Sequence, residues 1–154
     1  MFNSFDKEKP DPLRLPARYS LSGDIVNTAG GQLKVGLVGE NVFSKTIELK
    51  NNLVVAETGR QFMIVPVSAP GSGILAAAHK WSVVDSNGLG YDILSVDPDR
   101  VAGMVDKDKL KSPPGWVTTY LVFKVRESSE GYYVIMEFSN GDVSSNAWYL
   151  PGPS

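Results

Sequence analysis

The sequence predicts an all-β fold, an immunoglobulin-like antiparallel β-sandwich. Three observations predict it: short segments with alternating apolar and polar residues recur, Asn-Gly and other glycine turns separate them, and helical periodicity is almost absent. The clearest segments are FMIVPV, KWSVV, TYLVFKVRE and YYVIMEF, with the turns DSNGLG and SNGD. Because 154 residues suffice for one sizeable core, we expect a single domain.

The chain begins with a predicted extended arm over residues 1–18. Pro10, Pro12 and Pro16 fall within this arm, and proline lacks the backbone donor that helices and sheet ladders need. The β-sandwich domain is predicted over residues 19–147. An irregular tail, aromatic and then proline-rich, is expected over residues 148–154.

The first part of the domain, residues 19–56, is predicted to be a β-meander with turns at 30–31 and 51–52. The segment FMIVPV is the next strand. Pro66 lies inside it and predicts an edge position, a bulge or an early end of the strand.

The second part begins with residues 80–94, which predict a strand, a hairpin turn and another strand. Residues 97–114 are polar and broken by glycine and proline. They predict a long connection with one helical turn that Asp97 or Asp99 would cap. The segments TYLVFKVRE and YYVIMEF are expected to pair with each other across ESSEG.

The composition excludes several classes of protein. Fifteen basic residues are scattered among 17 acidic ones, for a net charge of −2, so nucleic acid is not an expected partner. The apolar stretches are too short to span a bilayer. No cysteine is present, which excludes disulfides and Cys-based metal sites. The polar start MFNSFDKEKPDP is no secretory signal, so the protein is either cytoplasmic or has lost a signal.

No catalytic motif is visible. His79 is the one histidine, so a His pair for zinc is excluded, and a Ser-His-Asp site would need His79 with Asp85 or Asp92. No serine lies in a Gly-x-Ser-x-Gly elbow, and no phosphate-binding glycine loop occurs. We therefore expect a protein that is not an enzyme, with no cofactor and no catalytic residues.

Calcium is the one metal with some support, because acidic residues gather near the predicted loops and hard cations prefer oxygen ligands. The residues are Asp85, Asp92, Asp97, Asp99, Asp106 and Asp108. Their order does not match an EF-hand, and the same sequences suit turns and helix caps. Calcium is therefore not favoured, and no metal ligands are assigned.

The aromatic residues are the better indication of function, because such side chains serve both cores and binding surfaces. We expect Trp81 and Phe123 in the core. Trp116 follows the turn sequence PPG, and Trp148 and Tyr149 stand in the predicted tail, so these three are candidates for contact with a partner. The prolines of the arm, at positions 10, 12 and 16, complete the candidate set.

Four segments also carry a family resemblance: RQFMIVPVSA, HKWSVVDSNGLGYD, PPGWVTTYLVFKVRE and YYVIMEFSNGD. In this order, over roughly residues 40–142, they resemble the bacterial immunoglobulin-like domains of the DUF4352 type, related to the secreted mycobacterial antigen MPT63. The resemblance implies an extracytoplasmic or cell-envelope location and a role in binding or adhesion. It brings no catalytic residues.

Two functional hypotheses follow. The first is a non-enzymatic binding or accessory subunit that contacts a protein partner with its arm and tail, within a cell-envelope or membrane-associated assembly. The second is a small-ligand carrier or hydrolase on a β-barrel, whose interior would be functional. The sequence names neither the partner nor the ligand, and it leaves the oligomeric state open.

Overall fold

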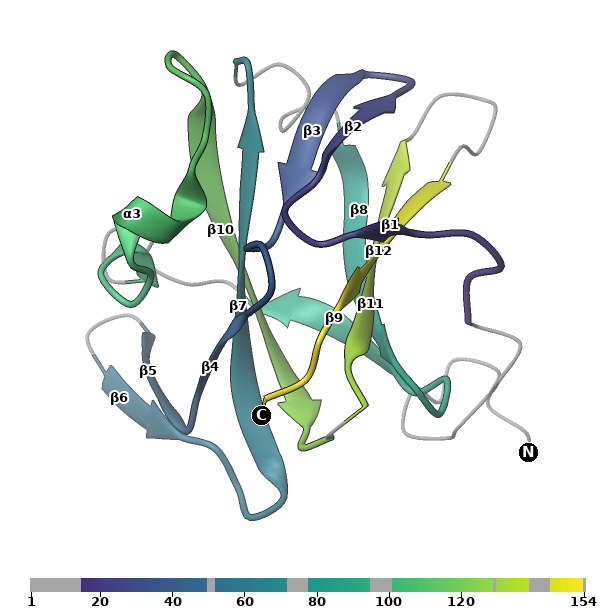
Figure 1. The fold of residues 1–154 in the computed structure, drawn as a ribbon. Helices are drawn as coiled ribbons and strands as arrows, with labels where there is room; N and C mark the ends of the chain where they lie inside the picture. Colours follow the sequence, from purple (N-terminus) through teal and green to yellow (C-terminus); the bar gives the residue numbers. More distant parts are fainter. Residues whose placement is uncertain are drawn as a thin grey trace.

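The computed structural model describes residues 15–49, 52–71, 78–94, 101–128, 130–138 and 145–153, and strands dominate this part of the chain (Figure 1). Twelve strands and one short helix are assigned within it. The strands are β1 Ser20–Leu21, β2 Ile25–Thr28, β3 Gly31–Val35, β4 Val42–Ser44, β5 Thr46–Leu49, β6 Asn52–Val55, β7 Arg60–Ala69, β8 Ala78–Asp85, β9 Gly90–Leu94, β10 Val117–Arg126, β11 Tyr132–Phe138 and β12 Ser145–Leu150. The helix is α3 Lys107–Leu110.

The strands form two facing layers. We call the layer β1-β12-β11-β8 sheet A and the layer β10-β7-β3-β2 sheet B; β4 also pairs with β7. The strand β9 joins the layers at one side, because Gly90 to Asp92 pair with β8 while Ile93 and Leu94 pair with β10. All pairs are antiparallel except β1 with β12, which is parallel.

At the opposite side of the sandwich the N-terminal segment passes from one sheet to the other. Ser22 donates its backbone N–H to the Tyr149 carbonyl in sheet A, at 3.2 Å, and Gly23 donates to the Val35 carbonyl in sheet B, at 2.8 Å. Gly23 has a φ of +83°, and a Cβ there would lie 2.5 Å from the Val38 side chain. Glycine thus permits the sharp change of sheet.

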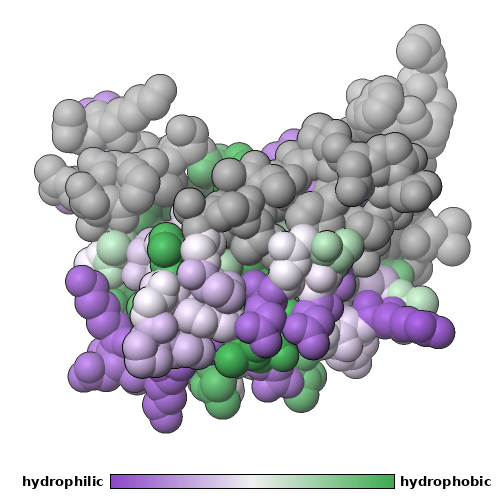
Figure 2. Space-filling model, turned by 90° about the horizontal axis from the view of Figure 1, so that it is seen from above, coloured by the Kyte–Doolittle hydropathy of each residue, from purple (hydrophilic) through white to green (hydrophobic). Residues whose placement is uncertain are grey.

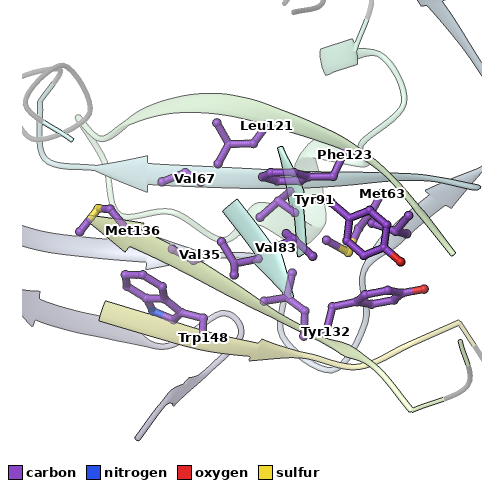
Figure 3. Close-up of a cluster of buried hydrophobic side chains, with 14 of the residues drawn as sticks. Val35, Met63, Val67, Val83, Tyr91, Leu121, Phe123, Tyr132, Met136 and Trp148 are labelled. Atoms are coloured by element: carbon purple, nitrogen blue, oxygen red, sulfur yellow. The ribbon is translucent and has the colours of Figure 1, made fainter. Parts of the chain in front are cut away.

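The main core lies between the inner faces of the two sheets. Alternate residues of each strand point inward, as the period of two requires. Met63 and Phe123 of sheet B and Trp148 of sheet A are completely buried there (Figure 3). Phe123 was expected in the core; Trp81, also expected there, is partly buried against it. The all-β class and the sandwich architecture predicted from the sequence are confirmed.

A third layer covers the outer face of sheet B. The side chains of Ile64 in β7 and Val122 in β10 point outward and are buried under the β5-β6 hairpin and residues 101–110. The meander predicted over residues 19–56 is confirmed in part: the β2-β3 and β5-β6 hairpins form near the predicted turns, but the strands do not make one continuous sheet. The β5-β6 hairpin is a separate two-stranded sheet, and β4 pairs with β7 instead of its neighbours in sequence.

The prediction from Pro66 is also wrong, since β7 is a central strand that continues for ten residues. On one side β7 pairs with β10 throughout. On the other side β4 pairs with β7 as far as Ile64, and β3 takes over from Val67. The Pro66 carbonyl accepts from Gly36 on this side, at 2.8 Å, so the missing N–H of Pro66 falls where the neighbouring strand changes.

Two further expectations need correction. The strands β10 and β11 do not pair with each other, because the chain crosses from sheet B to sheet A between them; the Tyr132 hydroxyl donates to the Arg126 carbonyl at this crossing, at 2.5 Å. The tail predicted from residue 148 begins later, since β12 continues to Leu150.

The helical turn α3 is capped by Asp106, whose carboxylate accepts from the Asp108 N–H at 3.0 Å. The two caps predicted from the sequence, Asp97 and Asp99, lie outside the described residues, so their role stays a prediction.

Candidate interaction surface

The outer face of sheet A carries three tyrosines in mutual contact. Tyr133 belongs to β11, Tyr149 to β12, and Tyr19 immediately precedes β1. The ring centroids of Tyr133 lie 5.3 Å from those of both Tyr19 and Tyr149, and the remaining pair is 5.9 Å apart. The rings meet edge-on or tilted, which is the favoured geometry for aromatic pairs. We call this group the tyrosine cluster.

Strand register places these side chains on one face. Tyr133 lies opposite Tyr149, and Leu21 lies opposite Tyr149 on the other side. Because Trp148 points into the core, its neighbour Tyr149 must point outward, and Tyr133 and Leu21 share that direction. Tyr19 precedes Leu21 by two residues and so reaches the same face.

Hydrogen bonding and close packing hold the cluster in place. The Tyr149 hydroxyl donates to the Glu130 carbonyl at 3.0 Å. At Gly131, with a φ of +96°, a Cβ would lie 2.6 Å from the Tyr149 hydroxyl oxygen, so glycine is required for this approach. Burial, followed by the neighbouring Tyr19 and Tyr149, raises the pKa of Tyr133. The Tyr133 hydroxyl therefore stays neutral at physiological pH.

Part of the cluster is accessible to solvent: Tyr19 is exposed, and Tyr133 and Tyr149 are partly buried. Apolar residues reach the surface in several places, as the view from above also shows (Figure 2). Among the described residues the exposed large apolar side chains are Tyr19, Leu21, Ile25, Val38, Leu53, Val55, Ile93 and Val117. Tyr19 is 51% exposed and Leu21 is 58% exposed. No described element packs against this face, in contrast to the outer face of sheet B.

The residues predicted to bind a partner do not lie together in the structure. Tyr149 belongs to the tyrosine cluster. Trp148 is completely buried, with its ring 6.4 Å from that of Trp81. Its place in a tail open to a partner is therefore corrected: Trp148 is a core residue of β12, and its indole N–H has no hydrogen-bond partner among the described residues.

Trp116 lies at the other end of the molecule. It is half-buried in the turn before β10, where its backbone N–H donates to the Pro113 carbonyl at 3.2 Å. The ten residues of β10 span about 30 Å and separate this turn from the end of the sandwich where β11 begins. Pro16 is half-buried in the irregular segment before β1. Pro10 and Pro12 lie outside the described residues.

Tyr19 and Tyr133 were missed by the sequence analysis. Strand alternation contains a signal for Tyr133, since one residue of the pair Tyr132-Tyr133 must point inward and the other outward. Tyr132 is the buried one. Tyr19 joins the cluster through the parallel pairing of β1 with β12, which no local pattern indicates.

A buried carboxylate, Asp85, stands at the β8-β9 turn with 3% of its surface exposed. One of its oxygens accepts from the backbone N–H groups of Asn87 and Leu89, at 2.9 and 3.0 Å, and the other accepts from the Tyr91 hydroxyl at 3.0 Å. Burial, with a contribution from the Asp85 charge, raises the pKa of Tyr91. All these donors come from the turn and its strand, so Asp85 stabilises the hairpin.

Polar contacts also fasten the third layer to sheet B. The Lys34 ammonium, on a side chain that is almost fully buried, donates to the Leu110 carbonyl at the end of α3. Beside it, the Ser112 hydroxyl donates to that of Ser68 at 3.0 Å, and Ser68 bonds to the Thr118 hydroxyl at 2.9 Å. Burial, followed by the charge of Lys111, lowers the pKa of Lys34.

Within the described ranges, no group of three or more metal-ligating side chains is found. Of the acidic residues considered for calcium, Asp97 and Asp99 fall outside these ranges. The described helices include none long and apolar enough to cross a membrane.

Comparisons with known proteins identify no family for the chain. No family model matches the chain, and no curated protein matches it. Among solved structures, an uncharacterized beta-sandwich protein from Clostridium difficile 630 is similar with a TM-score of 0.46. The sequence identity is 10%, and the match covers 88% of this chain and 97% of the other.

Proposed function

We propose that the chain is a non-enzymatic binding module that recognises a protein partner with the outer face of sheet A. The observation that carries the proposal is the tyrosine cluster, which lies on the one outer sheet face that no described element covers, with Tyr19 exposed and Tyr133 and Tyr149 partly buried. The partner that suits it presents an apolar patch with hydrogen-bond acceptors, because tyrosine combines an apolar ring with a hydroxyl donor.

The physics of tyrosine supports this role. A tyrosine side chain has two rotatable bonds, so it supplies a large contact area at a low cost in conformational entropy. Tyr133 and Tyr149 are already held by ring contacts and by the bond to the Glu130 carbonyl. Little ordering remains for the moment of binding, which favours affinity. Leu21 adds an exposed apolar contact beside the cluster.

The interior of the sandwich, as far as the structure describes it, does not favour the second hypothesis, a small-ligand carrier or hydrolase. Side chains of the main core fill the space between the sheets (Figure 3). The described part of the chain does contain a pocket of about 210 Å³, but the pocket lies in the third layer, lined by Thr46, Ile47, Glu48, Leu53 and Met104. The buried carboxylate Asp85 is occupied by its own turn. Among the described residues we therefore find no convergent set of reactive groups that would favour an enzyme.

The resemblance to bacterial immunoglobulin-like domains adds a location to the proposal. It favours an extracytoplasmic subunit of a cell-envelope or membrane-associated assembly. Fractionation of the native cells tests this point: recovery of the protein from the envelope fraction supports it, and recovery from the cytosol alone contradicts it.

The binding role is tested by isolating the protein under mild conditions from its own cells and identifying the proteins that co-purify in a fixed ratio. The partner is then purified, and its affinity is compared for the wild type, Tyr19→Ala and Leu21→Ser. We expect each substitution to weaken binding about tenfold or more, as for anchors at an interface centre. Val38→Ser is the matched control, since Val38 is 63% exposed but lies outside the cluster. Equal affinity of all four proteins would contradict the proposal.

A further inference from the structure

The strand β6 combines exposed apolar side chains with an unpaired backbone edge. Leu53 and Val55 are 68% and 63% exposed, while Val54 between them is partly buried against the apolar cluster of the third layer. Among the described residues β6 pairs with β5 alone. A strand of another chain can pair with an exposed apolar sheet edge of this kind.

The direction of the backbone groups follows from the pairing. Leu49 lies opposite Asn52 across a two-residue connection, and the Ala56 N–H donates to the Lys45 carbonyl at 2.8 Å. Residues 52, 54 and 56 therefore direct their N–H and C=O groups toward β5. Because these groups alternate along a strand, Leu53 and Val55 direct theirs away from β5, into the open edge.

This pattern is symmetric about Val54. An antiparallel partner centred on Val54 would place Leu53 opposite Val55 of the other strand, and Val55 opposite Leu53. Both are then hydrogen-bonded pairs, so the four free backbone groups of each strand are satisfied together. Their four side chains also meet on the exposed face as an apolar cluster. The strand that meets these requirements is β6 itself.

We propose that β6 is a self-association edge, at which two copies of this chain pair antiparallel around Val54 to form a four-stranded sheet, β5-β6-β6-β5. The two-fold symmetry makes the contact isologous and closed, so it yields dimers and no fibres. This surface lies apart from the tyrosine cluster of sheet A, and the inference does not depend on the proposed function.

Charge does not oppose this arrangement. Glu48 lies opposite Leu53 on β5, so the two Glu48 residues of the dimer would stand on the outer strands. Three strand spacings separate them, about 14 Å. That distance exceeds the Debye length of about 8 Å at physiological ionic strength, so their repulsion is largely screened.

The contact is small. One four-residue strand pair buries less than the roughly 1,000 Å² that a stable interface needs. We therefore expect a weak dimer that forms as the protein concentration rises toward the millimolar range.

The test is sedimentation equilibrium of the full chain over such a concentration series. We expect the wild type to dimerise. The double variants Leu53→Lys/Val55→Lys and Leu53→Glu/Val55→Glu should each stay monomeric, because each pair of opposed positions then carries like charges. Leu21→Lys is the matched control, since Leu21 is equally apolar and 58% exposed but lies on sheet A, and it should dimerise like the wild type.

An equimolar mixture of the two double variants tests the register itself. Each introduced lysine then lies opposite an introduced glutamate, so the mixture should associate at least as strongly as the wild type. A wild type that remains monomeric throughout the series overturns the proposal. So do double variants that dimerise normally, and so does a mixture that fails to associate.

Discussion

The two outer faces of the sandwich differ in what covers them. On sheet B, outward residues such as Ile64 and Val122 are completely buried under the third layer, and Lys34 and Ser112 fasten that layer by hydrogen bonds. On sheet A, the outward residues Tyr133 and Tyr149 are only partly buried, and no described element covers them. The inner faces of both sheets are equally apolar, so the outward positions decide the difference.

The comparison shows how similar strands acquire different roles. A strand with an unbroken apolar run needs burial on both faces, and the chain supplies it for residues 62–67 of β7 with a hairpin and a helical segment. A strand with tyrosine at its outward positions can leave that face open to water, because the hydroxyl is solvated while the ring packs on its neighbours. The covered face contributes to stability, and the open face is the one on which we propose that a partner binds.

The largest expected effect compares one isoleucine on each face. Ile64→Ala removes a completely buried side chain under the third layer and should lower the free energy of unfolding by about 2–5 kcal/mol. Ile135→Ala removes a half-buried side chain from the open face and should cost about 1 kcal/mol. Urea denaturation measures both. Equal costs would show that the outer face of sheet A is covered in solution.

The next effect concerns the support of the tyrosine cluster. Gly131→Ala introduces a Cβ 2.6 Å from the Tyr149 hydroxyl oxygen and 2.7 Å from the Leu150 carbonyl oxygen, at a positive φ. We expect a loss of about 3 kcal/mol. Gly115→Ala is the control, because Gly115 has a φ of +84° but open space around it, so it should lose about 1–2 kcal/mol from backbone strain alone. Thermal or urea unfolding distinguishes the two, and indistinguishable losses would mean that the ring moves away freely.

A smaller effect concerns the fastening of the third layer. Lys34→Met keeps an apolar stem but removes the donor to the Leu110 carbonyl, and should cost about 1–2 kcal/mol. Hydrogen exchange should become faster in residues 107–110 and stay unchanged in β11. Lys109→Met is the control, since Lys109 makes an exposed ion pair with Glu40 at 2.8 Å, of little value to stability. An unchanged exchange rate in Lys34→Met would show that other contacts hold the layer.

The same lysine gives a pH dependence with a defined sign. The pKa of Lys34 is lowered in the folded protein, so the unfolded chain binds more protons in the window below the ordinary pKa of 10.5. The stability of the wild type relative to Lys34→Met should therefore rise as the pH increases through that window. A stability difference that falls over the same range would contradict the burial of the Lys34 ammonium.

Local patterns predicted the elements well and their partners poorly. Phe123 was correctly expected in the core, and DSNGLG identified the β8-β9 hairpin, because both signals act within a few residues. The crossing of the chain between β10 and β11 depends on contacts far apart in sequence. A five-residue connection suits a hairpin equally well, so the sequence could not distinguish the two.

The candidate surface was predicted in part for the same reason. Tyr149 was identified as an aromatic residue near the C-terminus, but its partners Tyr19 and Tyr133 come from strands that only tertiary pairing brings together. Trp148 lies in the same aromatic segment as Tyr149, but its side chain points into the core, because successive side chains of a strand point to opposite faces. If β12 had been identified as a strand, its alternation would have assigned Trp148 and Tyr149 to opposite faces.

The most direct test of the binding role places a photoreactive amino acid at position 21 or at position 53 and irradiates the native cells. If the outer face of sheet A is the binding surface, position 21 should give one discrete adduct with a different protein, and that adduct should weaken when Tyr19→Ala is added. Position 53 should not capture that protein. Adducts with the other protein at position 53, and none at position 21, would contradict the account.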